Sequence, residues 1–178
     1  MKSSTAIPLT IKIDPRVHAA SADLQSLFTS QVKLAAMVSK SADAALEVHS
    51  AREQLGALSK SAQPQTKEAI EALDKELAGV LSGRETAAGA EAEPGLDDVA
   101  GESAALYEQV GMADAAPTAA QLKAADRTSE EVSEALARWE KSKASSIPAL
   151  NRQLEGAHLP ILNLEQKPQS MPDSGDED

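Results

Sequence analysis

The feature that most constrains the fold is a single β-strand pattern, Pro-Leu-Thr-Ile-Lys-Ile-Asp-Pro-Arg-Val at residues 8–17, in front of a chain that otherwise has helical spacing. Leu9, Ile11 and Ile13 alternate with polar residues, and an Asp-Pro pair ends the strand. No later segment offers a second strand, so the backbone groups of this one have no ladder partner here. We therefore expect residues 1–19 to be an orphan strand and linker from a missing β domain.

Alanine dominates the composition: 34 of the 178 residues are alanine, and only Phe28, Tyr107 and Trp139 are aromatic. Alanine has the highest helix propensity and buries little area, so the composition favours closely packed helices over a sandwich or barrel. The formal net charge of -11 argues against nucleic acid and anionic membranes as partners, because both attract clustered Lys and Arg. No apolar run approaches the ~18 residues of a membrane span. The absence of cysteine excludes disulfides, zinc-thiolate sites and thiol catalysis.

The spacing of apolar residues predicts an all-α, antiparallel three- to four-helix bundle with a long first helix, preceded by the orphan strand. The expected helices cover residues 22–59, 64–81, 97–111 and 118–155. In the first helix the apolar stripe follows two seven-residue series. These are Leu27, Leu34, Ser41, Val48, Leu55 and Leu24, Gln31, Val38, Ala45, Arg52. Such spacing predicts knobs-into-holes packing against neighbouring helices, with the closest approach at Ser41 and Ala45.

The later helices have apolar faces of their own. We expect them to bury Ile70, Leu73, Leu77 and Val80 or Leu81 in the second helix, Val99, Leu106 and Val110 in the third, and Leu122, Ala125, Ser129, Val132, Leu136 and Trp139 in the fourth. On the surface of the second helix, Glu71 and Lys75 have the i,i+4 spacing of an ion pair. Trp139 is interpreted as core filling, whereas Tyr107 is left open between core and interface.

Start and stop signals set the helix ends. Ser21 or Asp23 is expected to cap the first helix, Asp97 or Asp98 the third, and a Thr118 to Gln121 capping box the fourth. Pro148 removes a backbone donor and predicts a kink or a break.

Composition then divides the chain into three parts. Residues 20–162 form the helical bundle, which includes a flexible loop over 82–96 where glycine and proline replace large apolar residues. Residues 163–178 are polar and acidic and are expected to be a disordered tail.

Residues with catalytic chemistry are sparse. The only histidines are His18, His49 and His158, and none has the spacing that places two metal ligands on one helix face. They are interpreted as a strand-exit residue, a helix-surface residue and a loop residue. No Gly-x-Ser-x-Gly elbow or glycine-rich phosphate loop occurs.

Carboxylate pairs such as Glu68 with Glu71 and Glu130 with Glu134 lie on polar helix faces. A glycosidase needs two carboxyl groups in a cleft, so we interpret these pairs as solvated surface. We expect no catalytic, cofactor-binding or metal-binding residue in this chain.

Several short motifs resemble one family. These are the strand segment above, Gly111-Met112-Ala113-Asp114-Ala115-Ala116-Pro117-Thr118, Leu136-Ala137-Arg138-Trp139-Glu140 and Ile147-Pro148-Ala149-Leu150-Asn151. In order, over Leu9 to Leu162, they resemble the C-terminal tail of bacterial exported BNR/Asp-box β-propeller proteins of the sortilin type, often labelled glycosyl hydrolase or sialidase-like. In that family a propeller and a small β-sandwich precede a helical bundle.

The resemblance implies a parent protein and a compartment. The Asp-box pattern is absent from this chain, so no catalytic residue carries over. The parent implies a periplasmic or extracellular location; this chain shows no signal peptide, and a free-standing gene product would be cytoplasmic.

The resulting functional hypothesis is a noncatalytic helical accessory or protein-interaction module at the C-terminus of a β-propeller protein. Its partner is the propeller or sandwich of the parent, or another protein. One alternative is a fragment of a glycoside hydrolase whose catalytic propeller is missing here. A second alternative is a self-associating coiled-coil protein, since the sequence leaves the oligomeric state open.

Overall fold

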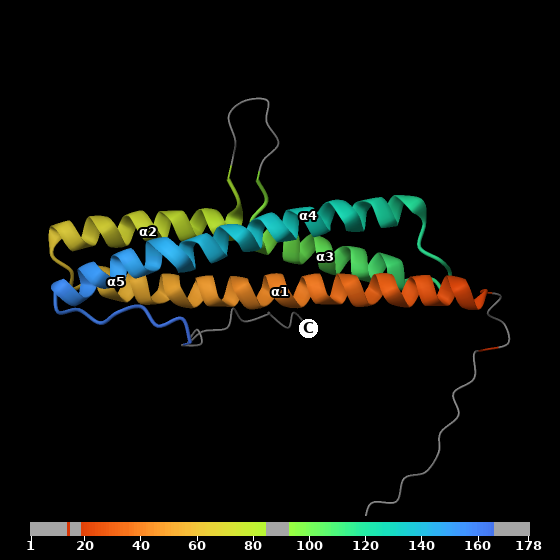
Figure 1. Cartoon of the computed structure of the whole chain (residues 1–178), viewed down its shortest axis with the longest axis horizontal. Helices are drawn as coiled ribbons and strands as arrows, with labels where there is room; N and C mark the ends of the chain where they lie inside the picture. Colours follow the sequence, from red (N-terminus) through yellow and green to blue (C-terminus); the bar gives the residue numbers. More distant parts are fainter. Residues whose placement is uncertain (1–13, 15–18, 85–92, 166–178) are drawn as a thin grey trace, which may run out of the picture.

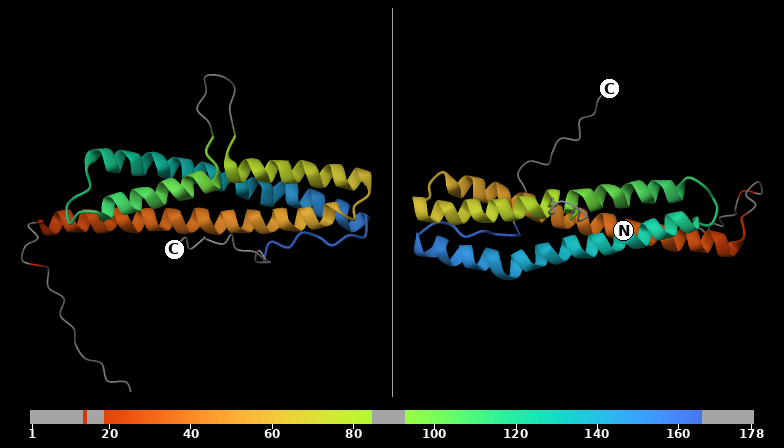
Figure 2. Two further views of the ribbon diagram at one scale, coloured as in Figure 1. Left: turned by 180° about the vertical axis from the view of Figure 1, so that it is seen from behind. Right: turned by 90° about the horizontal axis from the view of Figure 1, so that it is seen from above.

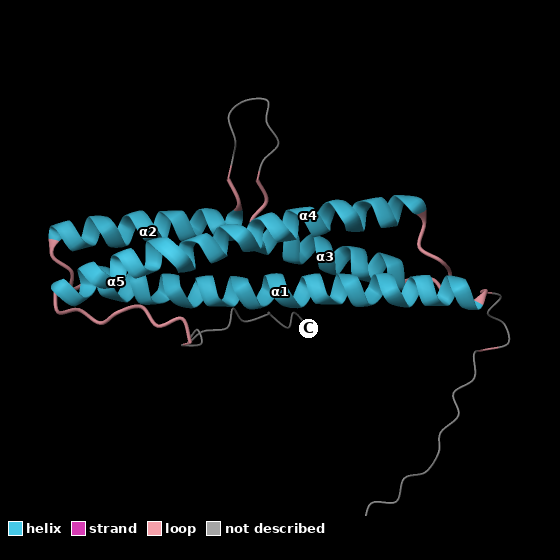
Figure 3. Cartoon of the chain, in the orientation of Figure 1, coloured by secondary structure: helices cyan, strands magenta, loops and turns pink. Residues whose placement is uncertain are grey.

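The computed structural model of the chain describes residue 14 and residues 19–84 and 93–165, and these form an all-α bundle as the sequence predicts (Figure 1). Its helices are α1 (Ser21–Ser59), α2 (Pro64–Ser82), α3 (Leu96–Gly111), α4 (Ala119–Lys141), the π-helical turn η1 (Ser142–Ser146) and α5 (Ile147–Gly156). The predicted strand lies outside the described residues. Within them, Figure 3 shows helices joined by loops.

The helices form long rods that lie side by side (Figures 1 and 2). α1 runs the full length of the bundle, and α2 and α3 follow one another along it in the opposite direction. α4, η1 and α5 make the third rod, which runs in the same direction as α1. Each cross-section therefore contains three helices. Among the described residues, no helix has both the length and the apolar character needed to cross a membrane.

The long helix α1 buries a wider face than the sequence predicts. Every member of the first seven-residue series is buried, from Leu27 to Leu55. In the second series only Ala45 is fully buried, and Leu24, Gln31, Val38 and Arg52 are half-buried. The buried face also includes Met37, Ala44, Ala51 and Leu58, which lie outside both series. The reason is that two rods flank α1, so its buried face follows positions three and four residues apart and turns toward both neighbours.

The caps agree with the sequence in one helix and differ in two. The Thr118 box is confirmed: the Gln121 amide donates to Thr118 Oγ1 (3.2 Å) and the Thr118 amide to Gln121 Oε1 (2.8 Å). Neither Ser21 nor Asp23 caps α1, because Ala20 is the last extended residue and its side chain has no acceptor. The N-cap of α3 is Gly95, whose amide donates to Asp98 Oδ2 at 2.9 Å.

The described ends of the predicted flexible loop 82–96 are held together at the base of the loop. Arg84 and Glu93 exchange two backbone hydrogen bonds of 2.9 and 3.0 Å. Beside them Gly83 has a φ of 74°, and its backbone packs against Gly95. We call these two glycines the glycine junction. Residues 85–92 lie outside the described part of the chain.

Pro148 neither breaks nor ends the fourth helical segment. Its missing N–H and its ring disturb the turn before it, where the structure has the π turn Ser142–Ser146. Lys141, Ser142, Ser146 and Ile147, at the two ends of this turn, have right-handed helical dihedrals, and α5 continues from Ile147.

The single tryptophan lies in the core, as predicted, with 1% of its surface exposed. Its Nε1 donates to Glu47 Oε2 at 2.8 Å, which joins α4 to α1. Lys143 lies 5.4 Å from the indole centre and 2.7 Å from Glu140. Burial lowers the pKa of Lys143, but hydrogen bonds and charges from Glu140 and Glu47 outweigh it, so the pKa is raised overall.

The other predicted faces are mostly confirmed, with differences on α4 and α2. Leu122 is 42% exposed, and Thr128 and Ala135 are buried instead. Ser129 and Leu136 are half-buried. The buried positions 125, 128, 132, 135 and 139 are three or four residues apart, as packing between helices requires. The buried face of α4 is therefore rotated slightly about the helix axis from the predicted face. On α2, Glu71 lies 3.9 Å from Lys67 and forms no ion pair with Lys75.

Thr128 provides a test of this packing, since its Oγ1 is buried and has no hydrogen-bond partner among the described residues. Thr128→Val should stabilise the protein by about 1 kcal/mol, because a methyl group replaces an unsatisfied hydroxyl of similar shape. Thr118→Val is the matched control and should destabilise by about 1 kcal/mol through loss of the capping box. Urea unfolding followed by circular dichroism measures both. A lower midpoint for Thr128→Val would contradict the assignment.

The predicted boundary between bundle and tail at residue 163 is also wrong. Asn163 exchanges two hydrogen bonds with the Gln54 side chain, each 2.8 Å long. Leu162 is buried, and Leu164 packs against the core. These contacts hold the chain on the bundle as far as Leu164, and residues 166–178 lie outside the described part.

Candidate functional site

The residues considered for catalysis are scattered over the described surface. His49 is exposed on α1, 3.8 Å from Asp97, and His158 is exposed after α5. His18 lies outside the described residues. The pairs Glu68 with Glu71 and Glu130 with Glu134 are exposed on α2 and α4. The described residues contain no group of three or more acidic or histidine side chains that could hold a metal ion.

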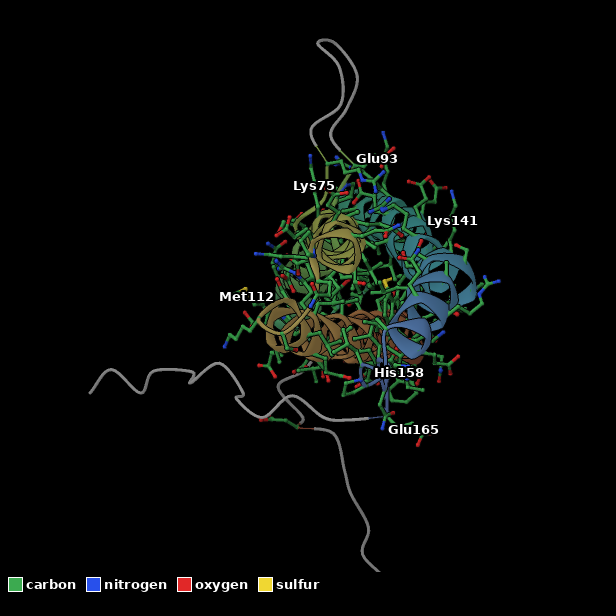
Figure 4. All side chains as sticks on the ribbon, turned by 90° about the vertical axis from the view of Figure 1, so that its left-hand side faces the viewer. Lys75, Glu93, Met112, Lys141, His158 and Glu165 are labelled. Atoms are coloured by element: carbon green, nitrogen blue, oxygen red, sulfur yellow. The ribbon has the colours of Figure 1, made fainter. Side chains whose placement is uncertain are left out.

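A half-open groove of about 840 Å³ lies between α2 and the rod of α4 and η1. We call it the basic groove, because Lys75, Arg84, Arg138 and Lys141 line it together with one carboxylate, Glu76. Figure 4 shows Lys75 and Lys141 on the same side of the bundle. A volume of this size fits a small ligand or a short peptide segment.

The floor of the basic groove is a hydrogen-bonded cluster. Glu76 Oε1 accepts from Ser142 Oγ (2.6 Å) and from Ser146 Oγ (3.0 Å). Both serines belong to the π turn η1, and such turns are found disproportionately at functional sites. Glu76, the one carboxylate in the lining, therefore binds two serine hydroxyls of η1, whereas the cationic side chains line the walls of the groove.

The cations of the groove differ in their partners. Arg138 is mostly buried; one Nη donates to the Pro94 carbonyl and the other lies 3.9 Å from Glu93. Its Nε is buried with no hydrogen-bond partner among the described residues. Within the same part of the chain, Lys75, Arg84 and Lys141 form no ion pair. The lining of the groove therefore holds four cationic side chains against one carboxylate, in a protein of net charge -11.

A second surface is apolar and lies between α1 and α3. We call it the apolar stripe. It consists of Phe28, Val32, Ala35, Ala42 and Leu46 on α1 with Ala104 and Tyr107 on α3. Phe28 is 60%, Val32 52% and Tyr107 41% exposed. A shallow pocket of about 310 Å³ lies among Ala35, Ala104 and Tyr107.

Neither surface is predicted above from the sequence, although each has a signal in it. The positions 28, 32, 35, 39, 42 and 46 are alternately four and three residues apart, which is a second stripe outside the buried seams. Tyr107, left open between core and interface, lies on this stripe. The basic groove left a weaker signal, because its cations come from segments more than fifty residues apart.

Comparisons with protein-family models, with curated proteins and with solved structures find no match for this chain. The basic groove and the apolar stripe are therefore the features that bear on its function.

Proposed function

We propose that this chain is a noncatalytic helical module that binds a β-rich protein domain through the apolar stripe. The observation that carries the proposal is that Phe28 and Val32 on α1 and Tyr107 on α3 are all exposed, and that Tyr107 lines one shallow pocket with Ala35 of α1. Large apolar side chains that gather on a surface mark interaction sites, and aromatic residues contribute most to binding there.

The position of the stripe favours a partner connected to the N-terminal segment. The predicted strand ends at Ile13, and α1 begins at Ser21. A β domain that contains this strand would be held close to the first turns of α1, where Phe28 and Val32 lie. The family resemblance supplies the same partner, the sandwich or propeller of an exported parent, and with it the proposed periplasmic or extracellular location.

The test uses the β domain encoded upstream of this chain, produced separately and titrated against the full chain by calorimetry. We expect Phe28→Ser with Val32→Ser to weaken binding at least about tenfold, which corresponds to about 1.4 kcal/mol of lost apolar contact. The control pair is Leu122→Ser with Ile161→Ser, which are also exposed apolar side chains but lie outside the stripe. This pair should bind like the wild type.

Three results would overturn the proposal. An upstream region that encodes no β domain would remove the parent. Equal binding by both double variants would remove the apolar stripe as the interface. Turnover of a fluorogenic sialoside by the full chain, above that of a heat-denatured sample, would contradict a noncatalytic role and favour the glycoside hydrolase alternative.

Self-association is the second candidate, and the spacing of the stripe favours it. Phe28 and Leu46, Val32 and Ala42, and Ala35 and Ser39 lie at equal distances from Met37, so an antiparallel second copy would pair them. The net charge of -11 on each copy opposes such a dimer. Sedimentation equilibrium of the same variants decides: a wild-type monomer at micromolar concentration removes this candidate.

A further inference from the structure

We propose that the basic groove binds the acidic C-terminal segment of this same chain, residues 168–178. This inference is independent of the apolar stripe and of its partner. It rests on the charge of the groove, on three cations along its walls that form no ion pair within the described residues, and on the length of chain that follows Glu165.

The charges of groove and segment are complementary. Four cationic side chains line the groove, and three of them, Lys75, Arg84 and Lys141, form no ion pair within the described residues. The segment carries four carboxylates within its last six residues: Asp173, Asp176, Glu177 and Asp178. A single exposed ion pair contributes little, but several charges held together in one groove form a network that contributes more.

The chemistry of the floor and walls also fits an extended acidic peptide. Glu76 Oε1 accepts hydrogen bonds from two serine hydroxyls, and its single negative charge faces four cationic side chains in the lining of the groove. The guanidinium and ammonium groups at the walls are donors only, which suits carboxylate acceptors.

The chain is long enough to reach. Glu165 lies on the side of the bundle opposite Lys75 (Figure 4). The described segment after α5 turns back along α1, toward the middle of the bundle, where α2 ends above it (Figure 1). Thirteen further residues span at most about 44 Å when extended. A bundle of three helices is about 20 Å across, so half its circumference is about 30 Å. The last residues of the segment can therefore reach the groove.

The experiment places a nitroxide label on the segment in the full chain. The protein has no cysteine, so Ser174→Cys gives one labelling site between Asp173 and Asp176. Paramagnetic broadening of backbone amide signals then reports which surface the label approaches. We expect the amides of Ala72, Gly79 and Ser146 to lose most of their intensity, while those of Ala35 and Ala104 on the apolar stripe keep theirs. At about 1 M salt, where the Debye length is about 3 Å, the broadening should disappear.

Charge-reversal variants show whether the basic groove is responsible. Lys75→Glu with Lys141→Glu should abolish the broadening. The matched control, Lys60→Glu with Lys123→Glu, changes the net charge equally but lies outside the groove, and it should retain the broadening. An unchanged amide spectrum elsewhere shows that each variant is folded.

Three outcomes would overturn the proposal. The first is weak broadening spread over the whole surface, and the second is broadening that both charge-reversal pairs remove equally. The third is broadening that arises only between molecules, seen when labelled chains without ¹⁵N are mixed with unlabelled ¹⁵N chains. This last result would assign the groove to the segment of another copy.

Discussion

Gly95→Ala should destabilise the bundle by about 3 kcal/mol, at the upper end of the usual cost of forcing extra atoms into a packed site. A Cβ on Gly95 would lie 2.0 Å from the Leu81 carbonyl oxygen and 2.3 Å from the Gly83 amide nitrogen. Both contacts are with backbone, which has no rotamer to change. The end of α2 and the start of α3 would have to separate, and the hydrogen bond from the Gly95 amide to Asp98 would be disturbed.

Gly101→Ala is the matched control, because this glycine lies inside α3 and a Cβ there would meet nothing within 4 Å. Alanine is the better helix former, so this variant should stabilise by about 0.8 kcal/mol. Urea unfolding at equal protein concentration compares the two. A Gly95→Ala variant as stable as the wild type would show that the glycine junction is not closed in solution.

The contact between the two glycines of the glycine junction could not be predicted from the sequence. Glycine and proline between two helical patterns correctly indicate an interruption between α2 and α3. They do not indicate that Gly83 and Gly95 touch, because that contact depends on how two helices meet in space. A flexible loop and a closed junction have the same local composition, and only the packing of the helices distinguishes them.

Dependence on helix packing also explains which buried residues of α1 and α4 could be predicted from the sequence. Leu27 to Leu55 could be found from a seven-residue spacing, because large aliphatic side chains at that period are rarely exposed on a bundle helix. Ala44 and Ala51 could not be predicted as buried, because alanine is equally common on a surface and its burial depends on where the second neighbouring helix lies. Met37 lies outside both seven-residue series, so the predicted spacing did not include it. Thr128 was missed for the converse reason, since a hydroxyl in a helical stripe normally indicates the polar face.

The apolar stripe could have been predicted from the sequence, whereas the basic groove could not. Phe28, Val32 and Leu46 lie at regular spacing on one predicted helix, so a second stripe could have been counted. The groove combines Lys75 of α2 with Arg138 and Lys141 of α4. No pattern within either helix distinguishes these cations from ordinary surface charges, and only the pairing of the two rods brings them together.

Trp139→Ala should have the largest effect of any substitution considered, a loss of about 3 to 5 kcal/mol. Trp139 is the bulkiest of the fully buried side chains, and its removal leaves a cavity between α4 and α1. It also removes the donor to Glu47 and the ring beneath Lys143. For a domain whose total stability is about 5 to 15 kcal/mol, such a loss unfolds a substantial part of the population on mild warming.

Circular dichroism at the helical band is the appropriate measurement, since the variant has no tryptophan left to report by fluorescence. Trp139→Phe separates the two contributions: it keeps an aromatic ring in the core but loses the Nε1 donor, and should cost about half as much as alanine. Tyr107→Ala is the surface control and should cost less than about 1 kcal/mol, because Tyr107 is 41% exposed. If Trp139→Ala and Tyr107→Ala were equally mild, the tryptophan would not be the centre of this core, and an interface role would have to be assigned to it instead.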